Sequence, residues 1–402
     1  MCSGFAQFGV TAALADVASE FGQPADAAAL AGQVGLSGTT LGIGLAIIRL
    51  ASLGALPLSS LADRLGRRRT LLGVVAGGLG LTALAAFAPT YWWWVAIFAA
   101  GRPLLSATNG LAGLIAAEET RTSDRAKAVA LIAAGYGLGA GLISFTRSAL
   151  GPGFGFRGLF LLTLIPLLAL PFLARVLREP VRFERLRTEA AGGRARTRTP
   201  VLGALAADVR GRLLLFALLY LAISFVTGPA NTFLFLYTES VLGMSSTVTA
   251  VMVALAGPVG LAGLLLGRLL ADRVGRRGTA GVTQALVALA CVVTYSGSPP
   301  AAIAGYLLAI LAGSTYAPAT GAQAAELFPT SVRGSVAGWL TAAGVLGAVA
   351  GLVVFGLLAD ALGGFRQAAI VVAVPVVLTS ALFWLLPETK DTDLEQADEG
   401  AV

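Results

Sequence analysis

The chain alternates between long apolar runs and short polar segments, and this pattern predicts twelve membrane-spanning helices. A nearly uncharged run of about 18 or more residues is long enough to cross a bilayer, and such runs recur along the whole sequence. Charges, prolines and glycine clusters separate the predicted spans at residues 3–21, 33–57, 70–88, 92–117, 127–150, 157–177, 213–237, 246–267, 279–297, 301–324, 334–358 and 366–386. We therefore predict an all-α integral membrane protein.

The predicted spans fall into two groups of six. We expect an N-terminal half at 1–177, a basic cytoplasmic linker at 178–212, a C-terminal half at 213–386 and an acidic cytoplasmic tail at 387–402. The first apolar run has no basic leader and is interpreted as a membrane helix rather than a signal peptide. Because it begins at residue 3, the native start is expected upstream of Met1.

Composition narrows the function classes further. Of 402 residues, 56% are apolar and only 12% are charged, against about 25% charged in a soluble domain. The 51 glycines suit membrane helices, which approach one another through small residues. There is no histidine, and Cys2 and Cys291 lie far apart in the sequence, so we expect no metal site, no cofactor and no disulfide framework.

The chain has a net charge of +7, and the distribution of its basic residues predicts the orientation in the membrane. With the N-terminus inside, every Lys and Arg falls on the cytoplasmic side except Arg49, Arg102, Arg147, Arg157 and Arg366. This bias follows the positive-inside rule and predicts a multi-pass plasma-membrane protein with both termini cytoplasmic. Since topology accounts for the basic residues, no nucleic-acid partner is expected.

One charged word occurs twice in this apolar chain. "SLADRLGRRRTL" stands at 60–71, and "LLADRVGRRGTA" stands at 269–280. An acid–arginine pair after the fourth span recurs after the tenth, and "GFR" at 155–157 recurs at 364–366. These repeats at nearly constant separation indicate duplication of a six-span unit. An even number of spans gives the two copies the same orientation in the membrane.

These words resemble motifs of the major facilitator superfamily. The repeated word is similar to its signature G-x-L-a-D-R-x-G-R-R between spans 2 and 3, and "GRPLLSATNG" resembles its span-4 arginine motif. "EETRTSDRA" and "ELFPTSVRG" resemble its inner loops, while "REPVRF" and "PETK" resemble segments of its sugar-porter-like members. The resemblance covers the whole chain. It implies a secondary transporter of twelve helices, built as two six-helix parallel repeats.

The repeated charged clusters predict an inner gate. Asp63 and Asp272 end spans, where a carboxylate can pair with the arginines that follow it. A topology signal alone explains the arginines but does not require the D-R-x-G-R-R spacing, so we expect the clusters to latch the gate in the outward-open state. The resemblance implies the same role. The predicted members are Asp63, Arg64, Arg67, Arg68, Glu118, Glu119, Arg125, Asp272, Arg273, Arg276, Arg277, Glu326 and Arg333.

Charged residues inside the spans predict the coupling site. A charge at mid-membrane costs at least about 2.5–3.5 kcal/mol and marks a functional position by default. Asp16 lies about 20 Å from the inner surface and Arg102 about 15 Å from the outer one, so we expect a reversible Asp16–Arg102 ion pair that couples transport to protons. The alternative is an interfacial Asp16 and an Arg102 that clamps backbone carbonyls. Arg147 is expected to snorkel towards the outer surface.

Substrate contacts are expected from one arginine and from polar residues of the C-terminal half. Arg49 has no acid near it in sequence and can meet a substrate carboxylate or Asp16. Gly228 and Pro229 are expected to break the seventh span near a cavity. Interhelical hydrogen bonding is the alternative for each polar residue. The candidates are Arg49, Thr227, Asn231, Thr315, Tyr316, Gln323 and Trp339.

Together these features predict a secondary transporter and not an enzyme. It would move a small organic anion or sugar-like metabolite by alternating access with protons, and we expect a monomer in the bilayer. No phosphate-binding loop is present, which argues against ATP-driven transport. One alternative is proton-driven efflux of drugs or metabolites, although "GYGLGAGLISF" lacks the G-P-x-x-G-G pattern of antiporters. An integral membrane enzyme is disfavoured because no nucleophile–base arrangement is present.

Overall fold

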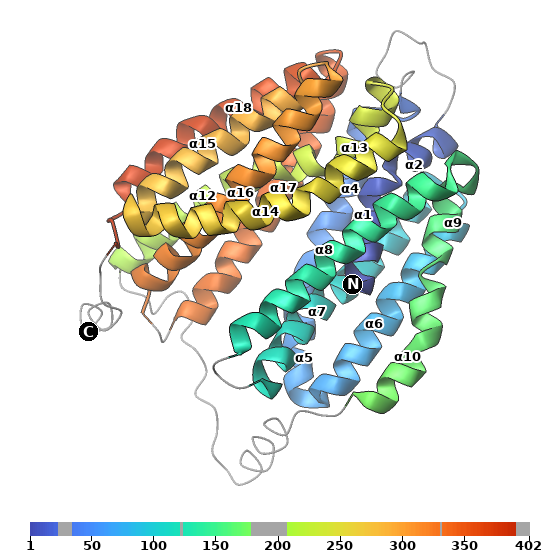
Figure 1. Cartoon of the computed structure of the whole chain (residues 1–402), viewed down its shortest axis with the longest axis horizontal. Helices are drawn as coiled ribbons and strands as arrows, with labels where there is room; N and C mark the ends of the chain where they lie inside the picture. The colour runs from blue at the N-terminus through green and yellow to red at the C-terminus, as the bar shows by residue number, and fades with distance from the viewer. Residues whose placement is uncertain (23–33, 121–123, 178–206, 330–331, 391–402) are drawn as a thin grey trace. The chain divides into compact units, whose positions relative to one another are not determined.

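A computed structural model describes residues 1–22, 34–120, 124–177, 207–329 and 332–390 (Figure 1). Within these ranges the chain is helical and has no β-strand. Nine of the helices found there are long and apolar enough to cross a membrane. Every predicted span coincides with a helix or with a helix interrupted by one turn.

The first six predicted spans are formed as follows. The elements are α1 (Cys2–Ala12), α2 (Leu14–Phe21), α4 (Gly38–Ala51), η1 (Ser52–Gly54), α5 (Ala55–Leu65), α6 (Arg67–Leu84), η2 (Ala85–Phe87), α7 (Tyr91–Glu119), α8 (Arg125–Leu150), η3 (Pro152–Phe154), α9 (Gly155–Leu161) and α10 (Leu164–Val176). The second span runs through η1 and α5 to Leu65, further than predicted, so Asp63 and Arg64 lie in its last helical turns.

The last six predicted spans are more continuous. The elements are α12 (Ala207–Thr232), α13 (Leu234–Leu236), the π-helical η5 (Tyr237–Val241), α14 (Ser246–Arg273), α15 (Arg276–Thr294), α16 (Pro299–Leu327), α17 (Arg333–Ala361), α18 (Phe365–Ser380) and η6 (Ala381–Leu385). The predicted break at Gly228 and Pro229 is wrong, because α12 continues through both and is interrupted at Phe233. Gly228 instead lies against Ala348 of α17, where a Cβ would come within 2.9 Å of that residue.

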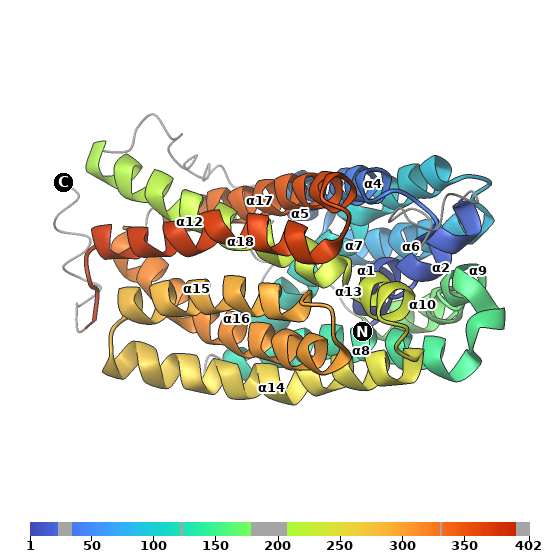
Figure 2. The ribbon, with the colours of Figure 1, turned by 90° about the horizontal axis from the view of Figure 1, so that it is seen from above.

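The helices form two compact units. One comprises Met1–Gln23, Ile47–Thr197 and Ser245–Ala250, and the other comprises Pro24–Ala46, Arg198–Met244 and Val251–Val402. The division passes through α4 and α14, so the first part of α4 belongs with the C-terminal elements. In the second unit α14, α15 and α16 lie side by side (Figure 2).

Glycines set the closest helix contacts inside each unit. In the first unit a Cβ on Gly4 of α1 would overlap the backbone carbonyl of Tyr136 on α8. In the second, Gly351 of α17 meets the backbone carbonyl of Phe225 on α12 in the same way. Small residues permit such approaches in membranes, where van der Waals packing holds helices together. The α1–α8 contact decides which charges of these helices meet.

Candidate functional site

Two arginines of the first unit form a positively charged site. Arg102 on α7 is half-buried, and its Nε is buried without a hydrogen-bond partner. Arg49 at the end of α4 has an exposed side chain, and its like charge repels Arg102, whereas Tyr136 on α8 interacts favourably with both arginines. No carboxylate in the described ranges forms an ion pair with either arginine. The structure therefore brings together two of the sequence candidates, and Tyr136 of the predicted fifth span joins them, although it was not among the candidates.

The structure does not contain the expected Asp16–Arg102 ion pair. Asp16 of α2 pairs instead with Arg147 of α8, whose Nε and Nη2 donate to the two carboxylate oxygens at 2.8 and 2.6 Å. The Arg147 side chain is only 10% exposed. The expectation that Arg147 snorkels away from the membrane is therefore wrong as well, because this side chain is held by the acid.

The packing of α1 explains this exchange of partners. Ser3 and Gln7 of α1 both donate to the carbonyl of Leu105 on α7, at 2.8 and 3.0 Å. Asp16 on α2 lies about 14 Å beyond Gln7 on α1 along the first span, whereas Arg102 lies about 5 Å from Leu105 along α7. The two are therefore about 9 Å apart along the helix axes. The close glycine contact between α1 and α8 places Asp16, on the following helix α2, beside Arg147 of α8.

A second ion pair follows one helical turn further along. Arg157 donates to Glu20 at 3.3 Å and to the carbonyl of Ala86 at 2.9 Å. Sequence reasoning missed this pair, although a signal was present. Asp16 and Glu20 share one helix face, and Arg147 and Arg157 are both exceptions to the positive-inside bias. Two acids one turn apart are natural partners for two arginines outside the cytoplasmic loops.

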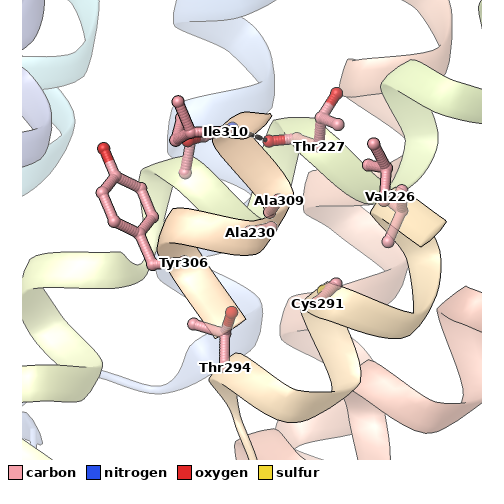
Figure 3. Close-up of a pocket in the computed structure, with 10 residues that line it drawn as sticks. Val226, Thr227, Ala230, Cys291, Thr294, Tyr306, Ala309 and Ile310 are labelled. Carbon is pink, nitrogen blue, oxygen red and sulfur yellow. Dashed lines mark hydrogen bonds between the residues drawn. The ribbon is translucent and has the colours of Figure 1, made fainter. Parts of the chain in front are cut away.

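The polar candidates of the C-terminal half do not form one site. Thr227 and Asn231 line a cavity of about 30 Å³ between α12, α15 and α16, together with Cys291 and Tyr306 (Figure 3). The Asn231 amide donates to the Thr227 carbonyl at 2.8 Å. A cavity of this size holds about one or two water molecules. It is too small for an organic solute.

The other candidates lie elsewhere in the second unit. The Thr315 hydroxyl donates to the Gly263 carbonyl at 3.1 Å and ties α16 to α14. Gln323 is fully buried and donates at 3.4 Å to a carbonyl of the segment after α18. Tyr316 is buried with its hydroxyl unbonded, whereas Trp339 is half exposed. The structure assigns helix-to-helix ties to Thr315 and Gln323 and does not gather these four residues.

The backbone conformation explains why both copies of the repeated charged motif contain a glycine. Gly66 and Gly275 have φ of +102° and +114°, and each directly precedes a helix. Such positive φ values favour glycine because it has no Cβ. A Cβ on Gly275 would also lie 2.5 Å from the carboxylate of Glu388. Both copies of the word therefore use glycine to reverse the chain between two spans.

The second copy of the word builds a compact charge cluster. Arg276 contacts Glu326 at 3.1 Å and Asp272 at 3.5 Å. The Arg276 and Glu326 side chains are only 15% and 13% exposed. Three predicted members of the inner gate thus meet in one place. Their role in gating stays a prediction.

Glu388 completes this cluster and was not among the predicted members. Its carboxylate accepts the backbone N–H groups of Arg276 at 2.7 Å and Arg277 at 3.3 Å. An acid at this position satisfies orphan donors of the first turn of α15 and opposes the positive end of the helix dipole. The Lys390 ammonium donates to the Arg273 carbonyl at 3.0 Å. The word "PETK" marked this segment but did not reveal what it caps.

The remaining predicted gate members are placed less closely together. Arg68 donates to two carbonyls at the end of α10, Arg67 is buried and Glu119 is exposed. Arg333 does not bond to Glu326, and its Nε and Nη2 are buried without hydrogen-bond partners. Four side chains lie outside the described part of the structure: Asp63, Arg64, Glu118 and Arg125.

Another carboxylate ties two distant spans within the second unit. Asp360 near the end of α17 accepts the backbone N–H groups of Gly38 and Thr39, each at 2.8 Å, and the Thr39 hydroxyl at 2.6 Å. These donors are the first residues of α4. Close packing accompanies the tie, because a Cβ on Gly38 would lie 2.8 Å from the Gly356 carbonyl. Sequence reasoning missed Asp360, since nothing near it marks a partner.

Comparison with known families identifies the architecture. A family model described as the Major Facilitator Superfamily matches residues 1–277 and 256–401. The chain belongs to the major facilitator superfamily. The prediction of a multi-pass membrane protein with the twelve-helix facilitator fold is thereby confirmed.

Individual relatives of this facilitator are transport proteins. It is 29% identical to a cis,cis-muconate transport protein of Acinetobacter baylyi over 252 residues, which cover 61% of this chain and 60% of the relative. It is 33% identical to a gallate transporter of Pseudomonas putida over 161 residues, 40% of this chain and 36% of the relative. The chain thus spans about 60% or less of the length of these relatives.

A solved structure supports the same fold. The xylose transporter XylE from E. coli, in its inward open conformation, aligns over 100% of this chain and 98% of its own with a TM-score of 0.75. The identity is 17%, so this likeness concerns the fold alone.

In this facilitator, removal of the Glu388 carboxylate is expected to loosen the C-terminal segment. Glu388→Ala removes the acceptor of two helix N–H groups, and loss of such a cap costs about 0.5–2 kcal/mol. We expect a lower melting temperature in detergent and faster tryptic cleavage after Lys390, measured by mass spectrometry. Glu119→Ala removes an exposed acid of the first unit and serves as the control. Equal cleavage rates in both variants would contradict the capping role.

Removal of the Asp360 carboxylate is expected to separate α4 from α17. Asp360→Asn leaves one acceptor oxygen for three donors, at a cost of about 1 kcal/mol. This cost changes the equilibrium between joined and separated helices by about fivefold. A cysteine at Ala359, which packs against Gly38, reports the separation by its labelling rate with a maleimide. We expect labelling several-fold faster than in the Ala359→Cys parent. Asp124→Asn, which disrupts an exposed pair with Lys127, should leave the rate unchanged.

Proposed function

We propose that this protein moves a small organic anion across the membrane by alternating access between its two repeats, with protons as the coupling ion. The observation that carries the proposal is the pair Arg49 and Arg102 beside Tyr136, without a carboxylate partner in the described ranges. An uncompensated cation in a membrane span is costly. A substrate carboxylate supplies the missing negative charge and fits the planar guanidinium fork.

The names of the relatives favour the same substrate class. Muconate is a dicarboxylate and gallate is a hydroxylated aromatic carboxylate, so both relatives are named for organic anions. The Tyr136 hydroxyl offers a hydrogen-bond partner to such a solute close to the two arginines. The likeness to a xylose transporter concerns the fold and does not favour a sugar.

Coupling to protons is proposed for Asp16, with Arg147 rather than Arg102 as its partner. Protonation of the Asp16 carboxylate would remove one charge of a bidentate pair and free the guanidinium. The charge cluster at Arg276 and the Asp360 tie would act as the two gates, since Glu326 lies near the end of α16, before α17 begins, and Asp360 lies near the end of α17. Each gate must open once per transport cycle.

We also propose the arrangement in the cell. The positive-inside bias supports a plasma-membrane location with both termini cytoplasmic. The facilitator fold supports a protein that works as a monomer.

The experiment is uptake by purified protein in proteoliposomes. The panel contains muconate, gallate, the uncharged amide of gallate, and xylose, each with and without an imposed pH gradient. We expect carboxylates to be taken up and to compete with one another, and the amide and xylose to do neither. Uptake of xylose or the amide at the rate of the carboxylates would contradict the anion class while leaving the family unaffected.

A further inference from the structure

A groove in the second unit opens between α14, α15 and α16. Its volume is about 270 Å³. Leu266 and Leu270 line it from α14, Val274 lines it from the turn that follows, and Val282 faces them from α15. All three helices are among those long and apolar enough to span a membrane, so the open side of the groove meets lipid.

The groove suits a hydrocarbon chain and not a polar solute. Its only polar side chains are threonines, and the hydroxyls of Thr279 and Thr283 already donate to the carbonyls of Gly275 and Thr279, both at 2.7 Å. Thr315 is likewise bonded to the backbone of α14 and α16. None of these hydroxyls has a donor left over for a substrate. An apolar concavity of this kind inside the bilayer is filled by an acyl chain.

One end of the groove carries positive charge. Val274 closes the α14 side, and the exposed Arg273 precedes it. At about 100° per residue, Arg273 projects within about 60° of Leu270 and therefore lies beside the groove, whereas Arg268 projects about 160° away, on the opposite face. No acid in the described ranges forms an ion pair with Arg273. The ammonium of Lys390 lies 3.0 Å from its carbonyl and adds a second cation.

We propose that this groove is a binding site for an anionic phospholipid, with an acyl chain between α14, α15 and α16 and the phosphate headgroup at Arg273 and Lys390. Basic pockets beside membrane helices recognise anionic headgroups by charge. The site lies at the face that we predict to be cytoplasmic, so the lipid would come from the inner leaflet. It is separate from the proposed anion site and does not depend on what is transported.

The acyl-chain part is tested by native mass spectrometry of the full chain in detergent. Phosphatidylglycerol and phosphatidylcholine with identical acyl chains are titrated separately. We expect phosphatidylglycerol adducts at about tenfold lower lipid concentration. Val282→Trp fills the groove and should abolish this tight binding. Leu289→Trp is the control, because Leu289 lies on the same helix with 51% exposure against 53% for Val282 but outside the groove.

The headgroup part is tested by charge. Arg273→Gln should reduce phosphatidylglycerol binding to the level of phosphatidylcholine, whereas Arg268→Gln, with the same loss of charge, should not. Gly278→Leu provides a second groove-filling variant if Val282→Trp melts early, since a Cβ there meets its nearest atom only at 3.9 Å. Equal binding of the two lipids, or equal losses in the groove variants and in Leu289→Trp, would overturn the proposal. Equal losses in the two arginine variants would overturn the headgroup assignment.

Discussion

Replacement of Arg102 by glutamine is expected to weaken binding of an organic anion by roughly 30-fold or more. Truncating one member of a buried charge pair costs about 2–5 kcal/mol, and each 1.4 kcal/mol is a factor of ten. The Arg102 Nε is buried without a partner, so the protein itself offers it no alternative acceptor in the described ranges. The measurement is binding of a radiolabelled carboxylate to the purified protein, together with counterflow in proteoliposomes.

Two further variants separate charge from geometry at this site. Arg102→Lys keeps the positive charge but loses the planar fork, so we expect an intermediate loss of affinity. Arg175→Gln removes an exposed guanidinium that lies over the ring of Phe172 at the end of α10, and it should bind substrate normally. If Arg102→Gln bound a carboxylate as tightly as Arg175→Gln, the two arginines would not be the anion site.

The fold was predictable because the bilayer leaves few choices. A segment that crosses it needs about 20 apolar residues and must satisfy its backbone by helix formation. The run lengths therefore predicted all twelve spans. The largest error is at the end of the second span, where the helix continues through the charged Asp63 and Arg64 to Leu65. In the seventh span the error is a helix break that was predicted but is absent at Gly228 and Pro229. Gly228 looked like a helix breaker but is a packing residue against Ala348, which only the neighbouring helix can reveal.

The candidate site was predictable in its residue types but not in its pairs. The repeated motif supplied Asp272 and Arg276, and the acid after the tenth span supplied Glu326; they meet because these charged residues lie at the ends of neighbouring spans. Glu388 and Asp360 escaped prediction because each carboxylate caps a helix that begins more than 100 residues earlier in the chain. Backbone N–H groups at a helix start leave no residue-type signal for a distant partner.

Replacement of Asp16 by asparagine is expected to abolish substrate accumulation driven by a pH gradient while sparing counterflow. Asparagine has the shape of the protonated acid but cannot release a proton. Counterflow needs only the exchange of bound solutes and therefore does not need a proton to be released. The measurement compares both modes in the same proteoliposomes. Glu20→Gln, which affects the more exposed pair with Arg157, is the control and should accumulate substrate.

The partner found in the structure makes this prediction sharper. Arg147→Gln leaves the Asp16 carboxylate without its bidentate donor, and breaking a largely buried pair destabilises a protein by about 3–5 kcal/mol. The double variant Asp16→Asn with Arg147→Gln removes both charges, so its melting temperature should recover towards that of the wild type. Accumulation should not recover, because no titratable carboxylate remains at that position. A double variant that regained both stability and accumulation would show that the pair is only a clamp between α2 and α8. The proton would then have to be carried by another group or by the substrate itself.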